Sequence, residues 1–168
     1  MNDYAREDRS EVPYKLILLA GFCGGVTEVL WIAVYGSLTA ISSGEIARQV
    51  TVSVFPAAAN LAWAPALGVI IHLVLSLALG VVFARMIWIP VARNFDVIGA
   101  LSCAIAALIA VWAFSFFIVL PVLNPNFTTL MPLSVTFVSK ALFGVAMAAV
   151  LQKTAGKLNC GTVAIHTA

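Results

Sequence analysis

Three ionisable residues, Glu28, His72 and Lys140, lie inside long apolar runs of this 168-residue sequence. A charge in the hydrocarbon region of a bilayer costs about 2.5 to 3.5 kcal/mol on insertion scales, so such residues usually pair or mark an ion or proton pathway. An acid and an ammonium group can form a neutral pair, and an imidazole can bridge them or relay a proton. The hydroxyl-bearing residues expected near them are Ser76, Ser139 and Thr136.

Composition places this chain in a membrane. Hydrophobic residues make up 62% of it and charged residues 10%, and the mean hydropathy is +1.07. Soluble domains carry about 25% charged residues. No polar stretch is long enough for a soluble domain, so residues 1–168 are predicted to form one membrane domain. The net charge of +2 is small and scattered, which argues against a nucleic-acid partner.

Four apolar runs are long enough for membrane-spanning helices, which need about 20 residues each. The fold class predicted is all-α, with four transmembrane helices in an antiparallel bundle. The predicted spans are residues 14–39, 61–88, 97–120 and 132–152, with flexible termini at 1–10 and 155–168. The first helix is expected to begin near Ser10, and the link 121–132, with its three prolines and two asparagines, predicts a turn.

The segment between the first and second spans has a helical pattern. Ser42 and Glu45 have the S-x-x-E spacing of a capping box. Apolar residues then recur at every fourth position from Ile46 to Val54, between polar ones. This pattern predicts a short helix lying in the membrane interface. The β-branched run at 50–54 is also compatible with a strand.

Each ionisable residue lies on a stripe of small residues, the kind of helix face that lets two helices approach closely. Glu28 follows three glycines on one face. His72 lies in a series of small or polar residues spaced by four, Gly68, His72, Ser76 and Gly80. Lys140 precedes Gly144 by four residues. The glycines predicted to pack between helices are Gly21, Gly24, Gly25, Gly68, Gly80 and Gly144.

Depth along the helices supports one cluster. Glu28 and His72 lie about 11 residues, and Lys140 about 8 residues, from the predicted outer ends of their helices, which is roughly 12 to 17 Å. If the helices are neighbours within one subunit, the three side chains meet at one level. The cluster then either stabilises the bundle or takes part in proton movement.

Basic residues predict the orientation. Of nine Lys and Arg residues, three precede the first span, two lie around the link between spans two and three, and two follow the fourth span. By the positive-inside rule, both termini are cytoplasmic, in what we expect to be a bacterial cytoplasmic membrane. The N-terminal residues mix acids with bases and the first apolar run is too long for a signal peptide, so this run is expected to remain as a span.

No cofactor or metal is predicted. One carboxylate and one imidazole are too few ligands for a metal ion, and Lys140 beside them opposes a cation. His72 is the only histidine in a span, which argues against a haem with two histidine ligands, and the three cysteines lie apart. Trp31 and Trp112 could border a quinone, but aromatic residues in spans usually pack or mark interfaces.

One acid among small residues, in the first of four short spans, is similar to the pattern of the small multidrug resistance transporters. This resemblance covers about Ala20 to Tyr35 and implies a small membrane transporter. The chain departs from that pattern in having His72 and Lys140 inside later spans, a long amphipathic first loop and a greater length. It is not assigned to that family on its sequence.

The sequence predicts a non-enzymatic accessory or structural subunit of a larger membrane complex of the respiratory or energy-transducing kind. The absence of a catalytic motif or a nucleotide-binding loop favours this interpretation, with lipid and other membrane subunits as partners. The alternative is a small, oligomeric proton-coupled transporter or channel that uses Glu28, His72 and Lys140 as a relay. An intramembrane enzyme using Ser76 or Ser139 with His72 has the least support, since no nucleophile motif is present.

Overall fold

The computed structural model describes residues 12–94 and 97–163. Over these residues the chain is helical and contains no strand. Four helical stretches are long and apolar enough to cross a membrane, namely Tyr14–Leu38, Ala64–Val91, Ser102–Leu123 and Leu133–Leu151. The prediction of an all-α membrane protein with four spanning helices is confirmed.

The helical elements follow one another with short connections. In chain order they are α1 (Tyr14–Leu38), α2 (Ser43–Val54), η2 (Pro56–Ala58), α3 (Ala64–Phe83), η3 (Ala84–Trp88), α4 (Ile89–Asn94), α5 (Val97–Phe114), η4 (Ser115–Val119), α6 (Leu120–Leu123), α7 (Pro125–Leu130) and α8 (Leu133–Val163). The η3 and η4 segments are π-helical turns that continue α3 and α5. Each of these two spans is therefore one long, locally widened helix.

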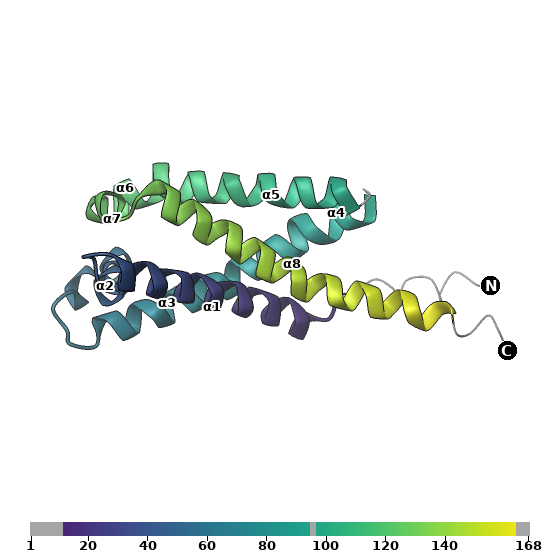
Figure 1. Cartoon of the computed structure of the whole chain (residues 1–168), viewed down its shortest axis with the longest axis horizontal. Helices are drawn as coiled ribbons and strands as arrows, with labels where there is room; N and C mark the ends of the chain where they lie inside the picture. The colour runs from purple at the N-terminus through teal and green to yellow at the C-terminus, as the bar shows by residue number, and fades with distance from the viewer. Residues whose placement is uncertain (1–11, 95–96, 164–168) are drawn as a thin grey trace.

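Helix α1 is the central element, because it packs extensively against both α8 and α3. Helix α2 packs mainly on α3, and α5 packs on α8, whereas α3 and α5 share no extensive contact. In Figure 1, α8 runs obliquely between the level of α5 and that of α1, and α2, α6 and α7 gather at the end away from the chain termini. Residues of α2, α3 and α5 line one cavity, which is described below.

The predicted capping box begins α2. The Ser42 side chain accepts a hydrogen bond of 3.1 Å from the Glu45 backbone N–H, which satisfies a helix donor that would otherwise lack a partner. The helix continues to Val54, so the strand alternative at 50–54 is wrong. The position of α2 in the membrane interface stays a prediction.

Helix boundaries differ from the predicted ones mainly at C-terminal ends. The second and third spans continue to Val91 and Leu123, and α8 continues to Val163, past the predicted end at residue 152. The tail predicted as loose from 155 is therefore helical up to Val163. Residues 152–158 include Gln, Lys, Ala and Leu, which favour helix, and no proline ends it. Helix α1 begins at Tyr14, directly after Pro13, so the expected start near Ser10 is wrong. The predicted flexible terminus 1–10 and residues 164–168 lie outside the described residues.

Glycines form the closest contacts between helices. A Cβ atom on Gly80 would lie 2.6 Å from the Gly21 Cα, and one on Gly24 would lie 2.6 Å from the Phe143 ring. Gly25 faces the Ser76 side chain at the same distance. Gly68 meets the Ala47 backbone, and Gly144 meets the Leu108 side chain. Five of the six glycines named from the sequence thus lie where a side chain would collide with a neighbouring helix, and a Cβ atom on the sixth, Gly21, would lie in a tight contact of 3.0 Å with the Ser76 carbonyl oxygen.

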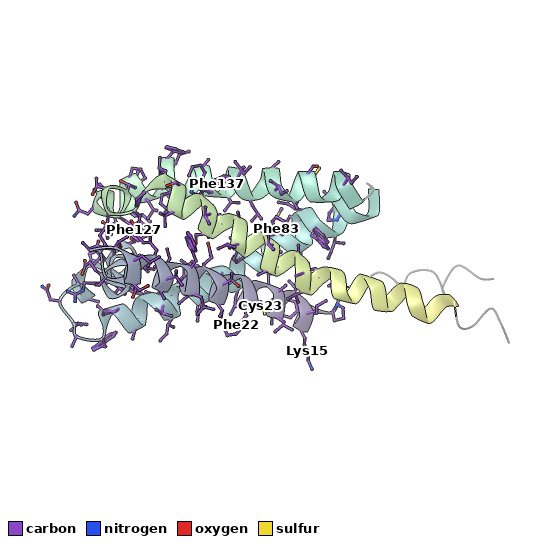
Figure 2. The ribbon with its side chains drawn as sticks, in the orientation of Figure 1. Lys15, Phe22, Cys23, Phe83, Phe127 and Phe137 are labelled. Carbon is purple, nitrogen blue, oxygen red and sulfur yellow. The ribbon has the colours of Figure 1, made fainter. Side chains whose placement is uncertain are left out.

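Two apolar clusters fill the interior. The larger one contains Ile17, Phe83, Phe143 and Met147 between α1, α3 and α8. The smaller one joins α2 to α7 through Ile46, Phe127 and Met131. Figure 2 shows Phe83 and Phe127 among the helices, with Phe22 and Lys15 on the outer side of α1.

Replacing Gly80 by Val is expected to lower the free energy of unfolding in detergent by about 1 to 3 kcal/mol, because the added carbons collide with the α1 backbone at Gly21. Thermal unfolding followed by circular dichroism measures this change. Gly44→Ala is the matched control, since a Cβ there has only the Ser42 hydroxyl oxygen near it, at 3.9 Å. Equal melting temperatures for Gly80→Val and the wild type would contradict close packing of α1 on α3.

Candidate functional site

Glu28 lies on the inner face of α1 and is 1% exposed. Lys140 Nζ lies 2.8 Å from Glu28 Oε1 and 3.0 Å from Oε2. The Ser139 hydroxyl donates a further hydrogen bond of 3.1 Å to Oε1. Both oxygens of the buried carboxylate therefore have a partner on α8, as a charge removed from water requires.

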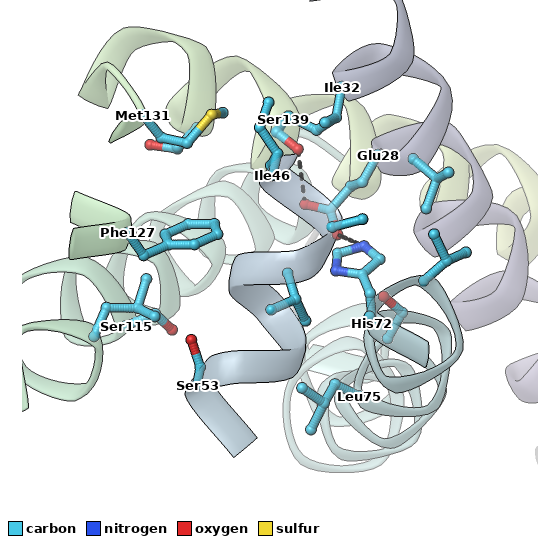
Figure 3. A pocket seen from close by; sticks show the side chains of 18 of the residues that line it. Glu28, Ile32, Ile46, Ser53, His72, Leu75, Ser115, Phe127, Met131 and Ser139 are labelled. Carbon is cyan, nitrogen blue, oxygen red and sulfur yellow. Dashed lines mark hydrogen bonds and ion pairs between the residues drawn. The ribbon is translucent and has the colours of Figure 1, made fainter. Parts of the chain in front are cut away.

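His72 approaches the same carboxylate from α3. Its Nε2 atom lies 3.3 Å from Glu28 Oε2, as the dashed line in Figure 3 indicates. The contact lacks the alignment of a hydrogen bond, and the buried Nε2 atom has no other hydrogen-bond partner. The attraction to Glu28 is therefore strong only when the imidazole is protonated. Glu28, His72, Ser139 and Lys140 are called the Glu28 cluster below.

Lys140 has a second neighbour that favours its positive charge. Its Nζ atom lies 5.3 Å from the centroid of the Phe143 ring, which is fully buried on the next turn of α8. A cation over an aromatic face is stabilised by about 0.5 to 2 kcal/mol. The ammonium group thus rests between the carboxylate and the ring.

The two remaining predicted hydroxyls lie close to the Glu28 cluster. Ser76 is buried one turn after His72 and packs against Gly25. Thr136 accepts a hydrogen bond of 3.0 Å from Trp112 Nε1 and donates one of 2.9 Å to the Leu133 carbonyl. Thr136 therefore ties α5 to α8.

A cavity of about 660 Å³ begins at the Glu28 cluster and extends toward α2 and α7. Small-molecule sites in proteins are commonly about 300 to 1,000 Å³ and mostly apolar, with few polar groups. All six predicted site residues line this cavity. Its other walls are mainly apolar and include Ile32, Ile46, Leu75, Phe127 and Met131 (Figure 3).

A second polar group, which was not predicted from the sequence, lies behind the cavity wall at α2, where only its Ser53 lines the cavity. Asn124 is buried, and its Nδ2 atom donates to the Gln49 carbonyl at 3.1 Å, the Gln49 Oε1 atom at 2.9 Å and the Ser53 hydroxyl at 3.3 Å. These three residues, the Asn124 network, join the break between α6 and α7 to helix α2. The sequence predicts only a turn at Asn124 and Pro125 and a short interfacial helix at α2, with no contact between them. The available signal for a buried polar contact was the amide of Asn124, which lies beside Pro125 in a very apolar chain.

Helix α2 is also fixed to the start of α3. The Thr51 hydroxyl is fully buried and donates a hydrogen bond of 2.6 Å to the Ala64 carbonyl. At the same contact between α2 and α3, Gly68 lies so close to the Ala47 backbone that a Cβ atom would collide with it. The two contacts make α2 and α3 one packed unit, and the Asn124 network joins this unit to α7.

Within residues 12–94 and 97–163, no group of three or more His, Cys, Asp or Glu side chains is placed to hold a metal ion. Cys23 and Cys103 are free thiols. The expectation that no metal or other cofactor binds stays a prediction.

Comparison with protein-family models, with curated proteins and with solved structures gives no match. Fold and site together define a class: a polytopic α-helical membrane protein with a buried acid, histidine and lysine at one end of an apolar cavity. The resemblance to small multidrug resistance transporters rests on residues 20–35 alone.

Lys140→Met is expected to destabilise the protein by about 3 to 5 kcal/mol, because it leaves a buried carboxylate without its counter-ion. Adding Glu28→Gln is expected to restore most of that loss. Reversible unfolding in mixed detergent measures the single and double variants. Lys15→Met, on the outer side of α1, is the control. A double variant as unstable as Lys140→Met would contradict a direct ion pair.

Asn124→Ala is expected to free α2 from α7, because it removes three hydrogen bonds of a buried amide. The free energy of local opening should fall by about 1 to 3 kcal/mol. Hydrogen–deuterium exchange of the α2 amides, residues 43–54, measures this change. Asn126→Ala, on the exposed side of α7, serves as the control, and equal exchange in both variants would contradict the Asn124 network.

Proposed function

We propose that this protein is a small proton-coupled membrane transporter in which Glu28 is the titrating group. The observation that carries the proposal is that the Glu28 cluster lines a cavity of about 660 Å³. An ion pair that only fixes helix register needs hydrogen-bond partners for its charges, but it needs no ligand-sized cavity beside it. An ion pair at the wall of a ligand-sized cavity is accessible to a proton or a solute.

The chemistry follows from the charge balance of the site. With Glu28 ionised, its charge and that of Lys140 cancel, and the pair is neutral in the membrane. When Glu28 gains a proton, Lys140 loses its counter-ion and becomes free to bind another group. His72 lies 3.3 Å from the carboxylate and lines the cavity, so it is placed to pass that proton.

Helix α2 is proposed to control access from one end. It forms part of the cavity wall and is held to α7 by the Asn124 network. The positive-inside rule assigns this end to the outer side of a bacterial cytoplasmic membrane, with both termini in the cytoplasm. Opening at this end would require the Asn124 network to exchange for water and the apolar contact of Ile46 with Phe127 and Met131 to separate. No catalytic role is proposed.

Glu28→Gln is expected to abolish proton movement, because an amide cannot take up and release the proton. A pH-sensitive dye inside proteoliposomes, under an imposed membrane potential, measures the flux. Ser102→Ala removes an exposed hydroxyl that donates to the Ile98 carbonyl within α5, away from the cavity wall, and it should keep wild-type flux. Equal flux in Glu28→Gln and the wild type would remove the proposal.

A second proposal is the accessory-subunit role, which the surface next to the cavity supports. The π-helical segment η4 lines the cavity on one side, while Phe117 and Ile118 on it are 58% and 56% exposed. A helix of another subunit that packed there would cover these two side chains. It would also cover the side of the cavity that lies between α3 and α5.

Mass measurement after gentle extraction separates the two proposals. For the accessory-subunit role we expect the protein to migrate in a larger complex with other subunits, and Phe117→Ala with Ile118→Ala to release it, because the anchoring side chains are lost. Phe22→Ala, on the outer side of α1, is the control. Migration only as a monomer or homo-oligomer would remove this second proposal.

A further inference from the structure

Resting on the proposed function, we infer that the substrate is an amphipathic monocarboxylate. Its carboxylate would bind Lys140 and Ser139 in place of Glu28, and its apolar body would fill the cavity. The charges around Glu28, the donors near it and the apolar walls each support this substrate class.

Charge neutrality limits what can bind. The titratable groups in contact with Glu28 are His72 from α3 and Lys140 from α8. When Glu28 is protonated, the site keeps the positive charge of Lys140, and a single anion restores neutrality. A cation would have to pair with Glu28 and force Lys140 to lose its proton. The Phe143 ring opposes that loss, because its contact with Nζ stabilises the ammonium form.

Hydrogen-bond donors also outnumber acceptors at this end of the cavity. Lys140 and Ser139 both donate to the Glu28 carboxylate. The buried His72 Nε2 atom has no aligned hydrogen bond and can donate to a second carboxylate. Once Glu28 is protonated, these donors need an acceptor with the shape of the group they lost, and a carboxylate has that shape.

The remaining volume calls for an apolar body. A cavity of about 660 Å³ has room for about 20 water-sized groups. Away from the Glu28 cluster it is lined mainly by side chains such as Val29, Val69, Leu79 and Val111. A chain or ring system of about ten to twenty carbons would gain free energy there, because its apolar surface is removed from water.

The exchange conserves charge. One proton from the aqueous phase adds to the Glu28 carboxylate, the ion pair between Glu28 and Lys140 breaks, and a new one forms between Lys140 and the incoming carboxylate. The occupied site is neutral, as is the empty one. Substrate and proton therefore cross together in a ratio of one to one.

Binding to the full-length protein in lipid nanodiscs tests the substrate class. The probes are decanoate, decylammonium and decanol, which share one chain and differ in the headgroup. Calorimetry in buffers of different ionisation enthalpy gives both the affinity and the protons taken up. We expect decanoate to bind at least tenfold more tightly than the other two, with about one proton taken up for each decanoate bound. Tighter binding of decylammonium, or of decanol, would overturn the inference.

Matched variants locate the headgroup. Because Lys140→Met alone leaves a buried acid unpaired, the test uses Glu28→Gln together with Lys140→Met. This variant should bind decanoate at least tenfold more weakly than Glu28→Gln alone, which keeps the ammonium group. Equal affinities in the two variants would overturn the inference. Normal Glu28-dependent proton flux with no preference for decanoate would retain the proposed transporter and remove only this substrate class.

Two further probes distinguish the source of the carboxylate. Oleate placed in the nanodisc bilayer represents a membrane lipid, and cinnamate in the aqueous phase represents a compact soluble acid. Competition by either one against labelled decanoate supports a monocarboxylate site and identifies the phase that supplies it. Failure of both to compete would contradict the inference.

Discussion

The ion pair between Glu28 and Lys140 is the constraint on which the rest of this structure depends. Neither charge is tolerated alone at this depth in a membrane, so α1 and α8 must approach until the two side chains meet. Gly24 permits that approach, because its missing side chain leaves room for the Phe143 ring. The same ring lies beside Lys140 Nζ, so helix packing and charge stabilisation use one side chain.

The cavity is a consequence of how the other helices attach to this pair. Helix α3 packs on α1 and α5 packs on α8, but α3 and α5 share no extensive contact. Helices α2 and α7 join the two sides at one end through the Ile46 cluster and the Asn124 network. The interior between them is therefore bounded by the charged residues at one end and, toward α2, by mainly apolar side chains and the Ser53 hydroxyl.

Sequence reasoning was effective where one physical rule decided the outcome. The length of the apolar runs predicted the four spanning helices, and the S-x-x-E spacing predicted the start of α2. Depth along each helix placed Glu28, His72 and Lys140 at one level, where the structure also brings them together. The Asn124 network and the cavity were not predictable in this way. The network depends on α2 packing against α6 and α7, and the cavity depends on α3 and α5 sharing no extensive contact. Helix periodicity carries no information on which helices pack together. The helical tail to Val163 was missed because weak propensity over a polar segment gives little signal.

Stabilising the bundle and moving protons are compatible uses of one ion pair. A buried pair that loses one partner costs about 3 to 5 kcal/mol, so the empty site resists opening. Protonation of Glu28 removes only one of the two charges, and the remaining Lys140 charge keeps most of that cost until an anion arrives. In the proposed transporter, coupling would follow from this asymmetry, because neither the proton alone nor the anion alone gives a neutral site. The ion pair that holds α1 against α8 would then also make uncoupled movement of either species unfavourable.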